Sequence, residues 1–352
     1  MTFKYKSEVI GKGGISARIV AKSVSAYSGQ EIITWEYDAP KCILAELNTH
    51  SIMVRNAQSS RAVPVSKVLE QIRNNPVTPV HWGKNQAGMV ASEENDSLVK
   101  VFHPEYDPEF SDDGYRSRVL AWKIYANRVA DIAEAWNDAG YHKQIVNRIG
   151  EAFTFVRGVI TATEIDNFFH LRYHKDADPF IQELAKCMWE AYEQAEAEVL
   201  YEGEWHTPYV EHTRLLVNNS LSYGSREYNE HDSVPTWYQI PLEQALKISA
   251  AACGQVSYRK LDTSEETVER VWNNLMGGEI IHASVTGHQA SPMKEPYNEH
   301  WHTEGLKWQD GATHVDKKGN FWSAQFKHWI MHRKLIDGEY CDRFHLRDKE
   351  EN

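Results

Sequence analysis

One stretch of the chain concentrates side chains that can hold an anion. Between Glu46 and Pro64 the sequence passes His50 and then enters a dense run of hydrogen-bond donors. The run supplies guanidiniums, hydroxyls and amides from Arg55, Asn56, Gln58, Ser59, Ser60 and Arg61. Serine hydroxyls and backbone N–H groups donate to phosphate oxygens, and arginine adds a planar fork. The segment therefore suits a phosphate, although a solvated polar loop ahead of a helix has the same composition.

The elements on either side must position this loop. Residues 17–24 and 31–37 are rich in β-branched and aromatic residues, which predicts two strands joined by a Ser-Gly turn. Pro40 then opens a short helix. Residues 65–72 predict a second helix, which ends at the Asn-Asn-Pro sequence. We expect the polar loop to connect these two helices.

Longer periodic segments follow. Apolar residues at helical spacing predict helices over 118–139, 180–200, 242–253 and 265–276. The first of these is expected to pack through Val119, Trp122, Val129, Ile132, Ala133 and Trp136.

Shorter segments complete the expected fold. Residues 157–161 predict a strand, and a short helix ends at Arg172. Residues 203–238 have no clear period and predict a connecting region. Residues 322–335 predict a final helix in a tail rich in Trp and His.

Composition and charge limit the classes of function. The 352 residues are 41% hydrophobic and 25% charged, which is ordinary for a globular protein. The formal net charge of −12 argues against a nucleic acid partner, so an anionic ligand needs a local basic pocket. Arginines available for such a pocket are Arg55, Arg61, Arg148, Arg157 and Arg172.

Cysteine usage and hydropathy indicate the compartment. The four cysteines are scattered without CxxC spacing, which predicts no disulfide framework and a reducing cytoplasm. No apolar run approaches the ~20 residues of a membrane span, so we expect no membrane partner. A metal site at His282, His288, His300 and His302 would lack the usual carboxylate or HExxH context, so we expect no metal.

The loop resembles the signature loop of the flavin-dependent thymidylate synthases. In that family an Arg-His-Arg triplet is followed, after seven residues, by a serine and then by Gly-Arg. Here Thr49-His50-Ser51 stands at the triplet, Ser59 at the serine and Ser60-Arg61 at the Gly-Arg.

A second segment resembles the same family. A family helix carries an asparagine and, five residues later, an arginine that follows a leucine and contacts the pyrimidine. Asn167 and Leu171-Arg172 keep that spacing, and Arg148 resembles a further family arginine. A guanidinium fixed beside a pyrimidine can stabilise charge that develops on the ring.

A third resemblance lies in an unexpected place along the chain. Residues 250–258 and 282–292 resemble the family's N-terminal third, yet here they follow the loop. The order of segments is therefore interpreted as permuted, as in larger viral-type relatives. Across this match, Ser257, His282, Ser284 and His288 fall on positions that bind flavin or shape its pocket.

The resemblance implies an α/β (α+β) fold with a mixed sheet and long helices. It assigns residues 1–200 to the first part of a nucleotide- and flavin-binding core and 241–300 to its completion. Residues 201–240 would connect the two, and 301–352 would form a C-terminal extension. It also implies a homotetramer, or a homodimer, with shared active sites.

The activity implied is transfer of a one-carbon unit from 5,10-methylenetetrahydrofolate to C5 of dUMP, giving dTMP, with FAD and NADPH. Arg172 is the implied catalytic residue. The implied substrate-binding residues are Glu46, Ser59, Ser60, Arg61, Arg148 and Arg172. The implied cofactor-binding residues are His50, Arg55, Asn56, Asn167, Ser257, His282, Ser284 and His288.

The chain departs from the family at the flavin and pyrimidine positions. Both triplet arginines are replaced, by Thr49 and Ser51, and Gln255 replaces a further arginine. Either Arg55 and tail residues such as Lys327 and Arg333 compensate, or the ligand has changed.

Glu46 stands where the family has a glutamine, and a carboxylate suits the exocyclic amine of dCMP. The alternatives are therefore a C5 methylase or hydroxymethylase of dCMP or dUMP for modified phage DNA, in the host cytoplasm, or a nucleotide-binding relative without flavin.

Overall fold

The computed structural model describes residues 3–102, 113–227, 236–256, 261–302 and 307–341, which form two compact units. The first unit comprises Met1–Val20, Ile33–Glu196 and Gln255–Leu261. The second comprises Ala21–Ile32, Ala197–Gly254 and Asp262–Asn352. Both combine helices with sheets, as the α+β prediction expects. These boundaries differ from those of the four predicted segments. The roles of those segments remain predictions, and so does the permuted family fold.

A mixed sheet contains the first predicted strands. Its order is β1-β2-β3-β7-β4, with β8 beside β2. β1 pairs with β2 and β7 pairs with β3 and β4 in antiparallel fashion, whereas β8 is parallel to β2. The strands are β1 (Ser7–Ile10), β2 (Ser16–Ser25), β3 (Glu31–Pro40), β4 (Val54–Ala57), β7 (Phe155–Ala162) and β8 (Glu198–Leu200).

β4 corrects the expectation that a polar loop alone connects the two helices. Its residues pair with Thr161–Gly158 of β7 at the edge of the sheet. The strand is short and polar, because an edge strand needs to bury little apolar surface.

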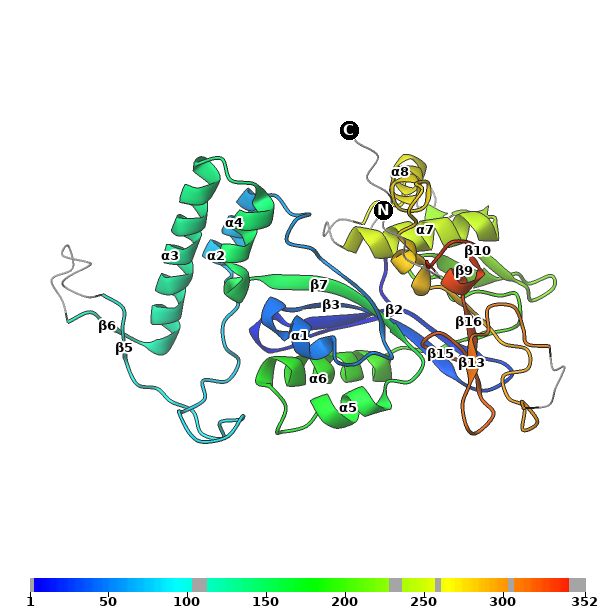
Figure 1. Ribbon diagram of the computed structural model, residues 1–352, viewed down its shortest axis with the longest axis horizontal. Coiled ribbons are helices and arrows are strands. Elements are labelled where there is room, and N and C mark those ends of the chain that lie inside the picture. Colours follow the sequence, from blue (N-terminus) through cyan, green and yellow to red (C-terminus); the bar gives the residue numbers. More distant parts are fainter. Residues whose placement is uncertain (1–2, 103–112, 228–235, 257–260, 303–306, 342–352) are drawn as a thin grey trace. The chain divides into compact units, whose positions relative to one another are not determined.

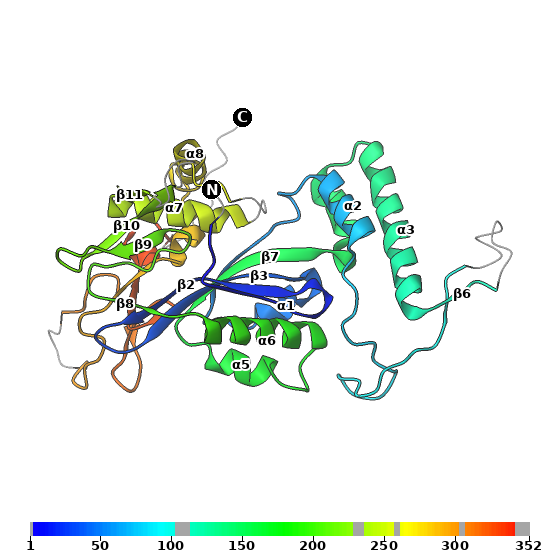
Figure 2. The same cartoon turned by 180° about the vertical axis from the view of Figure 1, so that it is seen from behind.

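Two helices cover one face of this sheet in the first unit. α5 (Asp166–Arg172) and α6 (Pro179–Gln194) lie side by side against the strands (Figures 1 and 2). Trp35, Leu184 and Met188 are fully buried between the layers. α6 ends at Gln194 rather than at residue 200, because Ala195 turns to extended backbone and the chain continues into β8.

A glycine in the middle of β7 permits a close aromatic contact. Gly158 pairs with Tyr37 of β3, and a Cβ built at Gly158 would lie 2.4 Å from the Tyr37 ring. Any side chain at Gly158 would therefore displace the buried tyrosine.

Three helices of the first unit share a separate apolar core. α2 (Val65–Asn74), α3 (Arg118–Asp138) and α4 (Lys143–Ile149) pack around Leu69, Ile72 and Val146. α3 confirms the predicted helix, but its expected apolar face is wrong in part. Val119, Ile132 and Trp136 are 42%, 52% and 42% exposed, whereas the helix buries its alanines. Small side chains let the neighbouring helices approach closely.

The remaining elements of the first unit are short. They are α1 (Leu44–Leu47), β5 (Val99–Lys100), β6 (Tyr115–Arg116), and the 3₁₀ turns Lys12–Gly14, Lys41–Ile43 and Glu151–Phe153.

In the second unit, residues 203–238 are not merely a connecting region. They contain an antiparallel sheet in the order β11-β10-β9, from β9 (Glu211–Arg214), β10 (Leu221–Glu227) and β11 (Thr236–Ile240). Trp205, Val210 and Tyr223 form its core with α7 (Leu242–Gln255), and α8 (Glu265–Met276) packs on α7. Polar and aromatic residues without clean alternation hid these strands from the sequence pattern.

The expected helix over 322–335 is wrong. These residues lie in β14 (Phe321–Ser323), β15 (Phe326–Lys327), β16 (Trp329–Met331) and a short 3₁₀ turn. Ala324 and His328 have positive φ angles of 50° and 63°, which reverse the chain where a helix would continue. β14 and β15 pair with each other, and β13 (His314–Val315) joins β14. β16 pairs with β12 (Ala290–Pro292).

None of the helices within the described ranges is long and apolar enough to cross a membrane.

Candidate functional site

The chain brings two predicted segments of the first unit together at Arg172, the last residue of α5. Its Nε donates to Nε2 of His50 over 2.9 Å, and its Nη1 donates to the carboxylate of Glu46. Glu46 lies on α1, and His50 lies in the turn that follows it. The polar loop and the Asn-x₄-Arg segment therefore meet in space.

His50 is buried and accepts a hydrogen bond from Arg172 through Nε2. Its ring packs edge-on against Phe168 of α5, with the centroids 5.1 Å apart. Burial lowers the pKa of His50, and the positive charges of Arg172 and Arg55 lower it further. Because a guanidinium can only donate, Nε2 is the acceptor and the neutral ring carries its proton on Nδ1.

Arg55 on β4 braces the same turn. Its Nη1 donates to the backbone carbonyls of Leu47 and His50 over 2.9 and 2.7 Å. Burial lowers the pKa of Arg55. The side chain holds the backbone that presents His50, so this nitrogen is already engaged within the protein.

Ser59 and Ser60 lie at a second place in the first unit. They line a cavity of about 310 Å³, which is at the lower end of the range of ligand pockets. Ser60 Oγ donates to Glu151 Oε1 over 2.6 Å, and Lys41 Nζ donates to both of these oxygens. The other lining residues are Gln58, Ala62, Val63, Pro64, Lys67, Val68, Gln71, Asn147, Thr154, Phe155 and Val156.

Asn147 of α4 fixes the wall of this cavity. Its Nδ2 donates to the carbonyls of Ser60 and Val63 over 2.7 and 2.9 Å. The side chain is buried, and its Oδ1 has no hydrogen-bond partner within the part of the chain that the structure describes. Leaving a buried acceptor without a partner costs free energy.

Two predicted phosphate-binding arginines lie apart from this cavity wall. Arg61 is exposed and does not line the cavity; its backbone N–H donates to Ser59 Oγ over 3.3 Å. Arg148 is exposed on α4 and acts on Glu151 through its charge. Burial alone would raise the pKa of Glu151, but the bonds from Lys41 and Ser60 lower it below its usual value.

Arg157, another arginine considered for a basic pocket, is paired within the sheet. Its Nε and Nη2 donate to Asp38 over 3.1 and 2.7 Å, and Arg18 donates to Asp38 over 2.9 Å. Burial opposes ionisation of Asp38, yet these bonds lower its pKa overall. Arg157 therefore forms an ion pair within the sheet rather than part of a ligand pocket.

The other predicted cofactor-binding residues are dispersed. Asn56 is half-buried on β4 and Asn167 is exposed on α5; within the described ranges, no hydrogen bond joins either to Arg172. In the second unit, His282 and Ser284 are exposed at the short 3₁₀ turn Ala283–Gly287.

His288 follows the same turn and is enclosed by the protein, with no exposed surface. Burial lowers its pKa to about 3, so the ring is neutral at physiological pH. Ser257 lies outside the described residues.

As they stand, these residues do not fit a flavin. One Nη nitrogen of Arg55 already donates to two carbonyls, and His288 is enclosed. A flavin dinucleotide carries a pyrophosphate that needs several cationic or backbone donors. Among the described residues, no three His, Cys, Asp or Glu side chains gather as a metal ion would require.

Lys41 and Glu151 were missed in the sequence. Lys41 precedes Ser60 by 19 residues and Glu151 follows it by 91, so no local spacing connects them. The only signal was the basic residue directly after Pro40, which alone indicates nothing.

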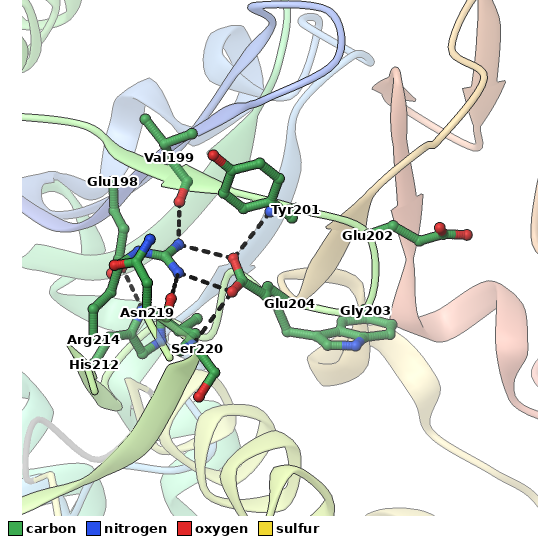
Figure 3. A network of polar contacts seen from close by, with 12 residues as sticks. Glu198, Val199, Tyr201, Glu202, Gly203, Glu204, His212, Arg214, Asn219 and Ser220 are labelled. Atoms are coloured by element: carbon green, nitrogen blue, oxygen red, sulfur yellow. Dashed lines mark hydrogen bonds and ion pairs between the residues drawn. The ribbon is translucent and has the colours of Figure 1, made fainter. Parts of the chain in front are cut away.

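A polar network in the second unit was also missed (Figure 3). Arg214 on β9 donates to both carboxylate oxygens of Glu204 over 2.9 and 2.8 Å. Arg214 also donates to the carbonyls of Asn219 and Val199. Glu204 accepts in addition from the backbone N–H groups of Tyr201 and Leu221.

The neighbouring His212 joins Glu198 and the buried Thr207 through its two ring nitrogens, over 2.7 and 2.6 Å. Because Thr207 has no exposed surface, this arrangement cannot present a hydroxyl nucleophile to a substrate.

No protein-family model and no curated protein matches the sequence. Among solved structures, a UMP/dUMP methylase, PolB, from Streptomyces cacaoi bound with 5-Br dUMP matches with a TM-score of 0.35 and 14% identity. The match covers 51% of this chain and 90% of that chain. The same enzyme bound with 5-Br UMP matches with a TM-score of 0.32 and 15% identity, over 51% and 89%. Likenesses this weak transfer no substrate and no residue role.

Proposed function

We propose that the first unit binds a deoxypyrimidine monophosphate and that the protein transfers a one-carbon unit to C5 of the base, converting dUMP to dTMP. The observation that carries the proposal is the contact between Arg172 and His50, residues 122 positions apart. Both belong to segments that resemble pyrimidine and flavin positions of one enzyme family. Their meeting supports the proposal, because a chance resemblance of two separate segments would not require them to touch.

The geometry gives Arg172 a defined task. When C5 of a pyrimidine becomes nucleophilic, negative charge develops on the ring oxygens, and a fixed guanidinium stabilises that charge. Glu46 and His50 hold two nitrogens of Arg172 and so limit its rotation. We assign Arg172 as the catalytic residue, with Glu46 and His50 as its positioning residues.

The cofactors enter the proposal through the resemblance alone. They are FAD, NADPH and 5,10-methylenetetrahydrofolate, and we derive no step through a flavin because the described residues do not fit one. We extend the same proposal to a homotetramer or homodimer in the cytoplasm, which size-exclusion chromatography with light scattering and cell fractionation would test.

A second candidate substrate is dCMP. Glu46 contacts Arg172, so an acceptor and a donor stand side by side at this position. A cytosine edge offers an amine donor next to an acceptor nitrogen, which matches such a pair better than a uracil edge. The alternative activity is therefore methylation or hydroxymethylation of C5 of dCMP.

The test is tritium release from C5-tritiated dUMP and dCMP, with FAD, NADPH and methylenetetrahydrofolate supplied. Visible absorbance of the protein with FAD measures flavin uptake in parallel. We expect release from one nucleotide, loss of release in Arg172→Ala, and retention in Arg73→Ala. Arg73 is a matched control because it pairs with Asp131 and Glu134 on the exposed surface of the same unit. No release from either nucleotide would contradict the activity, and no FAD uptake would remove the flavin.

A further inference from the structure

We propose that the cavity beside Ser60 is an anion site for the phosphate of the nucleotide, with Lys41 as its principal cation. We also propose that the Glu151 carboxylate, which does not itself line the cavity, holds Lys41 and Ser60 until a phosphate displaces it. The assignment of the phosphate to a nucleotide rests on the proposed function. The anion site itself rests on the cavity and its contacts.

The first argument is the chemistry of the donors. Lys41 Nζ and Ser60 Oγ both donate to one carboxylate oxygen of Glu151. An ammonium and a hydroxyl that converge on an anionic oxygen are the donors that bind phosphate. Glu151 therefore presents to them an anionic oxygen of the kind that a phosphate would supply.

The second argument is the space and an acceptor without a partner. The cavity of about 310 Å³ is lined by Lys41, Ser60 and the buried Asn147. Asn147 Oδ1 lacks a hydrogen-bond partner in the described ranges. A ligand that brings a hydroxyl or N–H group, as a nucleotide or a protonated phosphate does, would satisfy this acceptor.

The third argument is the placement of the alternative cation. Arg61, which the sequence suggested, is exposed and does not line the cavity. The side chain of Lys41 is only 17% exposed, so its charge acts where solvent screens it less. Lys41 is therefore placed to contribute more to binding than Arg61.

Displacement of Glu151 is structurally feasible. Its side chain is 38% exposed, so the carboxylate can turn into solvent. A competing internal anion weakens phosphate binding, because its own contacts must be given up first. Replacing Glu151 by glutamine removes the charge and keeps the shape.

The experiment is isothermal titration calorimetry of the full chain with dUMP, deoxyuridine and inorganic phosphate, with thermal melts as a check on folding. We expect Lys41→Ala to weaken dUMP binding about tenfold to a hundredfold and to leave deoxyuridine binding unchanged. Glu151→Gln should strengthen dUMP binding about threefold to tenfold. Lys84→Ala is the matched control, because Lys84 pairs with Glu93 on the exposed surface.

The outcomes separate the two proposals. If dUMP binds and weakens in Arg172→Ala but not in Lys41→Ala, the anion site is overturned while the proposed function stands. If no nucleotide binds but inorganic phosphate does, and Lys41→Ala weakens it, the anion site stands and the proposed function is overturned. If Glu151→Gln lowers the melting temperature and leaves binding unchanged, Glu151 is only a structural partner and its displacement is overturned.

Discussion

Two arginine–glutamate pairs, one in each unit, differ in how completely their hydrogen bonds are used. Arg214 donates to both oxygens of Glu204 and to two carbonyls, and Glu204 accepts two further backbone N–H groups. Arg172 donates to one oxygen of Glu46 and to His50. Among the described residues, none donates to the second oxygen of Glu46.

Exposure does not separate these pairs. The side chains of Arg214 and Glu204 are 23% and 18% exposed, and those of Arg172 and Glu46 are 20% and 32% exposed. The difference lies in the bonds that are left over for a ligand. A saturated pair holds the backbone in place, whereas an unsaturated pair at similar burial keeps donors and acceptors available for recognition.

The largest expected effect tests the saturated pair. Glu204→Ala should lower the free energy of unfolding by about 2–4 kcal/mol, because a partly buried guanidinium and two backbone N–H groups lose their acceptor. Urea denaturation followed by circular dichroism measures it. Glu202→Ala is the control, because the carboxylate of Glu202 lies 3.6 Å from Lys294 Nζ in a more exposed ion pair. Equal losses of unfolding free energy in both variants would show that the hydrogen bonds of Glu204 add no stability.

The same conservative change in both pairs should give opposite results. Arg172→Lys should weaken nucleotide binding by about 1–2 kcal/mol with little change in stability, because lysine keeps the charge but loses the planar fork. Arg214→Lys should lower stability by a similar amount and leave binding unchanged. Calorimetric titration and urea denaturation of both variants measure this; a stability loss in Arg172→Lys would show that its pair is structural too.

A smaller effect should appear in base preference. Glu46→Gln should shift the ratio of dCMP to dUMP affinity about fivefold toward dUMP, because an amide can donate to a carbonyl where a carboxylate cannot. Competition between the two nucleotides measures the ratio. An unchanged ratio would show that Glu46 positions Arg172 without touching the base.

The smallest effect concerns pH. Burial raises the pKa of Glu204, but the bonds from Arg214 lower it overall below its ordinary 4.5. A lowered folded pKa gives stability that is present above pH 4.5 and lost as pH falls through the folded pKa. The loss of unfolding free energy in Glu204→Gln should therefore be larger at pH 6 than at pH 3. The difference between the two losses should be less than about 1 kcal/mol. A difference in unfolding free energy that grows on acidification would reverse the sign and contradict the assignment.

The sequence predicted elements whose patterns are local. β2, β3 and α7 were expected from their β-branched or periodic residues. Residues 322–335 were misread because Trp329 and Phe326 stand at spacings that a helix also permits. His328 has a positive φ angle, which is uncommon for residues other than glycine, and the pattern of apolar residues does not predict it.

The candidate site was predictable only where a motif existed. The contact of Arg172 with His50 joins two segments that the sequence singles out separately, but the sequence did not predict the contact itself. Ser60 meets Lys41, Asn147 and Glu151 only through tertiary packing, because the three residues come from different parts of the chain. No sequence spacing predicts these contacts. Their chemistry became visible only once the chain was folded.

The parallel pairing of β8 with β2 has a consequence for synthesis of the chain. Ser23–Ser25 leave the ribosome 175 residues before their partners Glu198–Leu200. At a synthesis rate of about 5–20 residues per second, this edge of β2 stays unpaired for on the order of ten seconds or more. Closing so long a loop also carries an entropic cost that local contacts do not. A ribosome stalled before residue 198 would therefore hold a nascent chain whose β2 edge is open to pairing with another chain.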